Sequence, residues 1–223
     1  MKTLVVAIAV SALAQAGDPG WISKFDVQPG ELASTGRNPY FVLTPGYVLT
    51  LEDGRTRLVV SVLNETKVVD GIETRVVEER ESKDHQPIEV SRNYFAISTR
   101  TNAVYYFGED VDTYKNGKVA GHEGAWLAGV NGARFGLAMP GAPELRARYY
   151  QEIAPKIAMD RGEIVSLTER LRVPAGAFTD VLKIAETTPL EPGVKEYKYY
   201  GRGIGLLQDG SLKLVKYSAA PRN

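Results

Sequence analysis

Short runs of alternating apolar and polar residues fill most of the chain from residue 47 onward. In the run 163–173, apolar side chains recur on one face, and Glu169 is the only charge among them. A period of two is typical of a β-strand with one buried face. No long stretch shows a helical period, so the pattern predicts a chain built mainly of strands.

Tight turns separate these runs. Asp70-Gly71 divides two of them and tolerates the positive φ that a type I′ hairpin turn requires. The segment 83–87 is another turn, in which His85 stands where Gly would be expected after Asp. About ten strands with short connections result. This organisation predicts a mainly β fold, a curled antiparallel meander forming an open or incomplete barrel, or else a sandwich, with little helix.

Three segments interrupt the alternation. Residues 17–46 contain several Pro and Gly, which predicts an irregular segment leading into one antiparallel β domain, residues 47–223. Residues 128–143 are also rich in Gly and Pro and predict a long loop. Residues 144–160 suit a short helix or a strand almost equally, and the neighbouring strands favour a strand.

The first sixteen residues have the three parts of a secretory signal peptide: Lys2, an apolar run, and Ala14-Gln15-Ala16. We therefore expect an exported, periplasmic or extracellular protein. No later run approaches the roughly 20 apolar residues of a membrane-spanning helix, so we expect no span in the mature chain. The chain has 0 Cys, which excludes disulfides and thiol chemistry. Its 27 basic and 27 acidic residues balance, which leaves no field to attract nucleic acid.

The ending from Val173 to Leu207 reads VPAGAFTDVLKIAETTPLEPGVKEYKYYGRGIGLL. It resembles a recurrent ending of uncharacterised exported bacterial β-rich proteins, as do the pieces EVSRNYFA, YYFGEDVDTYKNGKV and GHEGAW. More distantly, PAG-x-F followed by a strand and an aromatic pair is similar to the last strands of lipoprotein-carrier (LolA/LolB) type open barrels. The resemblance implies an exported curled sheet and brings no catalytic residues.

Three adjacent tyrosine pairs place one ring on each side of their strands. Aromatic rings on a concave face are typical of a pocket for an apolar or sugar ligand, although ordinary sheet packing also explains them. The residues that we expect to line such a pocket are Tyr105, Trp126, Tyr149, Glu169, Tyr197 and Tyr199.

A carboxylate-dependent hydrolase centred on Glu169 is the alternative hypothesis, because Glu186 and Glu196 lie in strands that could face the same cavity. Pairing with an arginine such as Arg92 would explain Glu169 without catalysis. No serine-nucleophile elbow is present, and the glycines of 201–205 lack the following helix of a nucleotide site.

The segment 112–123 places Asp112, Asn116 and Glu123 at positions 1, 5 and 12 of an EF-hand calcium loop. Tyr114 occupies position 3, where an oxygen ligand belongs, and Asn116-Gly117 is a two-residue hairpin turn. The sequence therefore predicts a hairpin here and keeps calcium as the minor alternative. No other cofactor is indicated.

These features predict an exported, non-catalytic binding protein that carries an apolar or amphipathic ligand such as a lipid. The alternatives are the hydrolase and a structural or interaction module of the envelope. The interior of the sheet distinguishes them: an apolar cavity favours a carrier, clustered carboxylates favour catalysis, and a filled core favours a scaffold.

Overall fold

The alternating runs form one large antiparallel sheet in the computed structural model, which describes residues 20–218. The predicted signal peptide, residues 1–16, lies outside this range. Six strands follow one another across the sheet: β4 (Val48–Asp53), β5 (Thr56–Val69), β6 (Ile72–Lys83), β7 (Gln86–Ser98), β8 (Val104–Lys115) and β11 (Arg134–Met139). Five more do the same: β14 (Arg161–Val173), β15 (Gly176–Thr187), β16 (Glu196–Gly201), β17 (Gly205–Asp209) and β18 (Leu212–Tyr217).

Shorter elements complete the fold. They are the 3₁₀ turn η1 (Pro29–Glu31) and the strands β1 (Leu32–Ala33), β2 (Gly36–Asn38), β3 (Phe41–Leu43), β9 (Lys118–Gly121), β10 (Trp126–Leu127), β12 (Arg148–Tyr150) and β13 (Glu152–Ile153). Between residues 20 and 218, no helix has the length and apolar character needed to cross a membrane.

The hairpin turns follow from their residues. Asp70 and Gly71 have φ angles of 49° and 76°, and Asn116 and Gly117 have 53° and 74°, as two-residue turns with positive φ require. His85 adopts a φ of 65° although it is not Gly, in a turn whose flanking residues pair directly across β6 and β7. The predicted turns are therefore confirmed, and the missing Gly after Asp84 does not change the hairpin.

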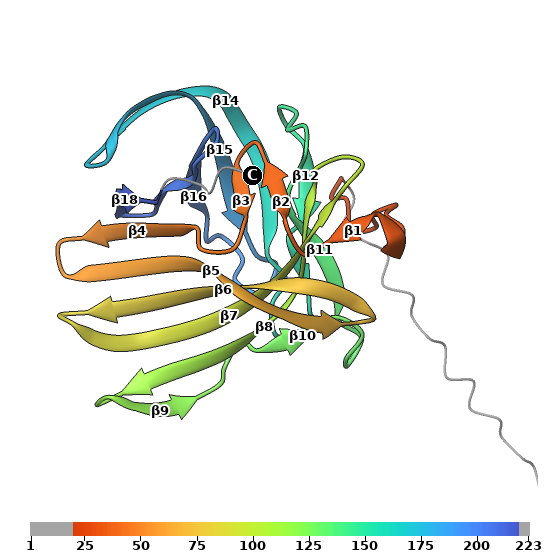
Figure 1. Ribbon diagram of the computed structural model, residues 1–223, viewed down its shortest axis with the longest axis horizontal. Coiled ribbons are helices and arrows are strands. Elements are labelled where there is room, and N and C mark those ends of the chain that lie inside the picture. Colours follow the sequence, from red (N-terminus) through yellow and green to blue (C-terminus); the bar gives the residue numbers. More distant parts are fainter. Residues whose placement is uncertain (1–19, 219–223) are drawn as a thin grey trace, which may run out of the picture.

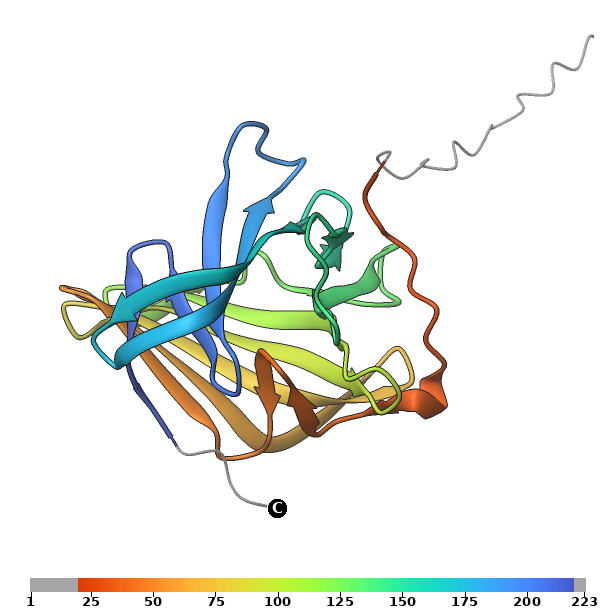
Figure 2. The ribbon, with the colours of Figure 1, turned by 90° about the horizontal axis from the view of Figure 1, so that it is seen from above.

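The sheet closes on itself almost completely. Pairing of β18 with β4 joins the two sets of strands, so that the second set lies across from the first (Figure 1, Figure 2). The strands at the two ends of the sheet, β12 and β13, are separated in the chain by Gln151 alone. The result is a nearly closed barrel with one unsealed seam, which confirms the predicted curled antiparallel fold.

Close backbone approach shapes this seam. Gly136 of β11 lies against the backbone of Gln151 and Glu152, and a Cβ at this position would overlap those backbone atoms. The backbone N–H of Gln151 donates to the carbonyl of Asp160 at 2.8 Å. The chain thus holds Gln151, Glu152 and Asp160 together where the barrel remains open.

Both faces of the first set of strands are covered, because alternate side chains point to opposite sides. Inside the barrel, a core cluster contains Val77 and Phe95; on the outer face, a second cluster contains Val76, Tyr94 and Phe107. Residues of the chain's first described segment and of β10 pack over this outer cluster.

Some irregular segments differ from expectation. Residues 17–46 include η1 and three short strands, and Tyr40 and Leu43 belong to the barrel core. Residues 128–143 were expected to form a loop but contain β11, which pairs with β8. Residues 144–160 form β12 and β13, as the preference for strand predicted. In β14, three register shifts break the regular alternation, and Ile164 is fully buried.

Candidate functional site

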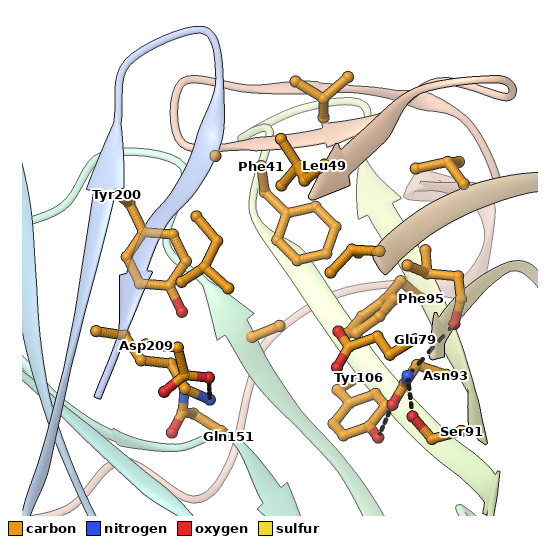
Figure 3. Close-up of a pocket in the computed structure, with 18 of the residues that line it drawn as sticks. Phe41, Leu49, Glu79, Ser91, Asn93, Phe95, Tyr106, Gln151, Tyr200 and Asp209 are labelled. Atoms are coloured by element: carbon orange, nitrogen blue, oxygen red, sulfur yellow. Dashed lines mark hydrogen bonds and ion pairs between the residues drawn. The ribbon is translucent and has the colours of Figure 1, made fainter. Parts of the chain in front are cut away.

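A cavity of about 430 Å³ lies inside the barrel. Its lining comes from most of the sheet and from the β2–β3 hairpin (Figure 3). The lining residues are Tyr40, Phe41, Val42, Tyr47, Leu49, Val60, Val62, Val77, Glu79, Glu89, Ser91, Asn93, Phe95, Tyr106, Glu109, Ala138, Gln151, Glu152, Asp160, Glu186, Lys198, Tyr200, Ile204, Gly205, Leu206 and Asp209.

Part of the cavity wall is apolar. Phe41, Leu49 and Phe95 project into the cavity from three different elements (Figure 3). The ring of Phe95 lies 5.0 Å from Phe41 and 4.7 Å from Tyr106, with which it stacks. Val60 of β5 extends this surface. Such a wall offers apolar area for a ligand to bury.

The rest of the lining is strongly acidic. Among the described residues around the cavity, seven are Asp or Glu and Lys198 is the one Lys or Arg. Alternation places the carboxylates there: Glu79 shares the inward face of β6 with Val77, and Glu89 shares that of β7 with Phe95.

Lys198 of β16 is held by two of these carboxylates. Its Nζ lies 2.9 Å from Glu186 Oε2 and 3.6 Å from Asp209 Oδ2. Gln151 Nε2 donates to the other oxygen of Glu186 at 2.8 Å. Burial disfavours the ammonium, but the charges of Glu186 and Asp209 outweigh it and raise the pKa of Lys198 well above its ordinary value.

The opposite wall and the seam hold carboxyl groups that form no ion pair with any described residue. Burial, together with the charge of Glu79, raises the pKa of Glu109 from 4.5 to about 7. Burial likewise raises the pKa of Glu79. Burial and the charge of Asp160 raise the pKa of Glu152 well above its usual range, and these two carboxyls share a hydrogen bond. Burial thus disfavours the charged form of all three carboxyls, and a pKa of about 7 keeps Glu109 protonated below neutral pH.

Hydrogen bonds fix the positions of several of these groups. Trp126 Nε1 donates to Glu152 Oε2 at 2.8 Å from outside the cavity. Tyr106 donates its hydroxyl proton to Asn93 Oδ1 at 2.5 Å, and Asn93 Nδ2 donates to Ser91 Oγ at 3.0 Å (Figure 3). The polar wall is therefore ordered without a ligand.

Among the described residues in and beside the cavity wall, two buried polar atoms lack a hydrogen-bond partner: Gln151 Oε1 in the cavity lining, and the hydroxyl of Tyr149 in the adjoining core. Tyr149 is 1% exposed, and burial followed by the charge of Glu186 raises its pKa. Buried polar groups are almost always paired, so Gln151 Oε1, which lines the cavity, marks a place where a bound molecule can supply the partner.

None of the six predicted pocket residues lines the cavity. Tyr105 and Trp126 belong to the outer cluster, while Tyr149 is packed into the barrel core. Tyr197 and Tyr199 lie 4.3 and 5.2 Å from the ammonium of Lys183. Glu169 pairs across β14 and β15 with Val181 and is also absent from the lining.

The tyrosine pairs nevertheless behave as alternation requires. Tyr106 and Tyr200, the neighbours of Tyr105 and Tyr199, are the rings that reach the cavity (Figure 3). The ring that lines the cavity is the other member of each pair from the one expected, because a period of two does not say which face becomes concave. Six acidic lining residues had no distinguishing signal beyond their place in strand runs or next to them: Glu79, Glu89, Glu109, Glu152, Asp160 and Asp209.

The segment 112–123 forms the predicted hairpin between β8 and β9. Asp112 Oδ1 lies 3.0 Å from His122 Nδ1, and Glu123 accepts a hydrogen bond from Thr113. Asn116 is a turn residue. In the part of the chain that the structure describes, no group of three or more His, Cys, Asp or Glu side chains is arranged to hold a metal ion. Calcium binding by Asp112, Asn116 and Glu123 stays a prediction.

Comparison with known proteins finds no relative of this chain. No protein-family model matches the chain, and no curated protein or solved structure is significantly similar to it. The resemblance of the ending to exported bacterial β-rich proteins and to LolA/LolB-type barrels stays a prediction. The cavity itself is therefore the basis for a functional proposal.

Proposed function

We propose that this protein is an exported binding protein that carries a small amphipathic ligand inside its barrel. The observation that carries the proposal is the cavity of about 430 Å³, in which an apolar wall faces an ordered polar wall. Ligand pockets typically measure about 300 to 1,000 Å³ and combine apolar lining with a few fixed polar groups. An envelope scaffold would have no need of such a space.

The contacts divide the ligand into two parts. An apolar portion would lie against Phe41, Leu49 and Phe95, and a polar head would reach the carboxylates at the seam. Ordered hydrogen bonds around Asn93 and Glu152 mean that little rearrangement is needed on binding. The periplasm or the extracellular space is the expected location, and a lipid or similar amphiphile is the expected partner.

Binding of a neutral apolar fluorophore, N-phenyl-1-naphthylamine, tests the proposal. We expect its fluorescence to rise on binding, and we expect Val60→Trp, which fills the apolar wall, to weaken binding at least tenfold. Val68→Trp is the matched control, because Val68 lies on the same strand but is 67% exposed. Native mass spectrometry of the purified protein should also detect a co-purified ligand. Absence of both signals would exclude the carrier.

A carboxylate hydrolase is the second candidate, now centred on the cavity and not on Glu169. It is favoured by Glu109, whose pKa of about 7 allows it to hold a proton as a general acid must. The ion-paired Glu186 supplies a second carboxylate. Turnover of 4-nitrophenyl glycosides that Glu109→Gln reduces at least a hundredfold would support this candidate; an inactive wild-type protein across the panel would reject it.

A further inference from the structure

We propose that the ligand is a cationic amphiphile, an apolar body bearing a protonated amine, whose ammonium group binds among the carboxyls of the seam. This inference rests on the proposed function and names the class of molecule that the cavity selects. It is carried by the excess of carboxyls in the cavity, by a buried acceptor without a donor, and by the position of the aromatic rings.

The resident cation leaves most of these carboxyls uncompensated. Lys198 pairs with Glu186 and Asp209, both on the wall formed by β15 to β17. Among the ion pairs of residues 20–218, none reaches Glu79, Glu109 or Glu152. A second cation therefore has acidic partners that the chain itself leaves unpaired.

The buried acceptor lies at the junction of the two walls. Within residues 20–218 no group donates to Gln151 Oε1, and its amide cannot reverse without losing the bond from Nε2 to Glu186. An ammonium carries three N–H donors and no acceptor, so it can satisfy this oxygen and a carboxylate at once. A carboxylate or phosphate head group would instead place further hydrogen-bond acceptors against Gln151 Oε1, which is itself an acceptor.

The aromatic rings that line the cavity also favour a positively charged ligand. Tyr106 and Tyr200 reach the cavity from opposite walls (Figure 3). The faces of such rings attract cations. Tyr106 stacks on Phe95, which belongs to the apolar wall. The ring of Tyr106 can therefore contact the amine while the apolar body of the ligand lies against Phe95.

Binding of a cation also displaces protons. Burial keeps Glu109 protonated up to about pH 7, and an ammonium beside it would favour its ionised form. Affinity should therefore rise as the pH increases through 7. The titratable groups that interact with Glu109 are Tyr106 on the same strand and, on other elements, Glu79, Glu89, Glu152 and Asp160.

The experiment compares three ligands with one apolar chain: decylammonium, decanol and decanoate, each displacing N-phenyl-1-naphthylamine from the protein at pH 7.5. We expect decylammonium to displace the fluorophore at a concentration at least tenfold below that of decanol, with decanoate weakest. Titration calorimetry in two buffers of different ionisation enthalpy should show proton release with decylammonium alone.

Substitutions test whether the preference for decylammonium over decanol arises in the cavity. Glu79→Gln combined with Glu109→Gln should abolish the preference for decylammonium over decanol, while binding of the neutral fluorophore persists. Glu65→Gln, an exposed carboxylate on β5, is the control and should retain the preference. Equal displacement by all three ligands would overturn the inference and leave the carrier standing. Failure of the fluorophore itself to bind would overturn the proposed function.

Discussion

Replacement of Glu109 with Gln is expected to stabilise the protein by about 3 kcal/mol at pH 8 and to change its stability little at pH 5. Burial raises the pKa of this carboxyl from 4.5 to about 7, and each pKa unit corresponds to about 1.4 kcal/mol. Between these values the native state binds more protons than the unfolded state, so the free energy of unfolding falls as the pH rises. At pH 8 the native protein holds a buried charge that Gln removes.

Urea unfolding at pH 5, 6, 7 and 8 measures this effect. The wild-type protein should lose stability steadily across the range, because burial also raises the pKa values of Glu79, Glu152 and Asp209. Glu109→Gln should flatten the decline, and Glu65→Gln should run parallel to the wild type. A stabilisation of equal size at pH 5 and pH 8 would contradict the assignment of the proton to Glu109.

Replacement of Lys198 with Met is expected to destabilise the protein by about 3 to 5 kcal/mol at pH 7, the usual cost of removing one partner from a buried ion pair. The loss arises because Glu186 and Asp209 would remain buried without their cation. Further removal of charge by Glu186→Gln and Asp209→Asn should recover most of the stability, since the three groups act together.

Chemical denaturation of the single and triple variants measures this cost. Lys195→Met is the matched control, because Lys195 lies exposed in the loop before β16 and should change the free energy of unfolding by less than about 0.5 kcal/mol. If Lys198→Met proves no more harmful than Lys195→Met, the ion pair does not hold the wall of the cavity together.

Local patterns were sufficient for the class of fold. Asp70-Gly71 and Asn116-Gly117 specify hairpins by their own conformational preferences, and alternation between such turns specifies antiparallel strands. A segment such as β11 was missed because Gly136 and its neighbours look like a loop; the glycine is present because the chain approaches closely at the seam.

The cavity could be predicted only in part. Alternation indicates that one ring of each tyrosine pair faces the interior, but it could not choose Tyr106 over Tyr105. Both faces of β6 to β8 carry apolar residues, because the outer face is covered by β10 and by residues near Phe25. Glu186 was recognised as a strand carboxylate, and its partners Lys198 and Asp209 were not.

Most strands, their turns and the antiparallel meander could be predicted, because these depend on residues close together in the chain. Which face forms the interior, and which carboxyls come together there, depends on how the sheet closes. Pairing of β18 with β4 brings Asp209 and Lys198 into the same cavity as Glu79, and the turn at Gln151 adds Glu152. These residues come from distant parts of the chain, and the raised pKa values of Glu79, Glu152 and Asp209 arise from a burial that closure of the barrel creates.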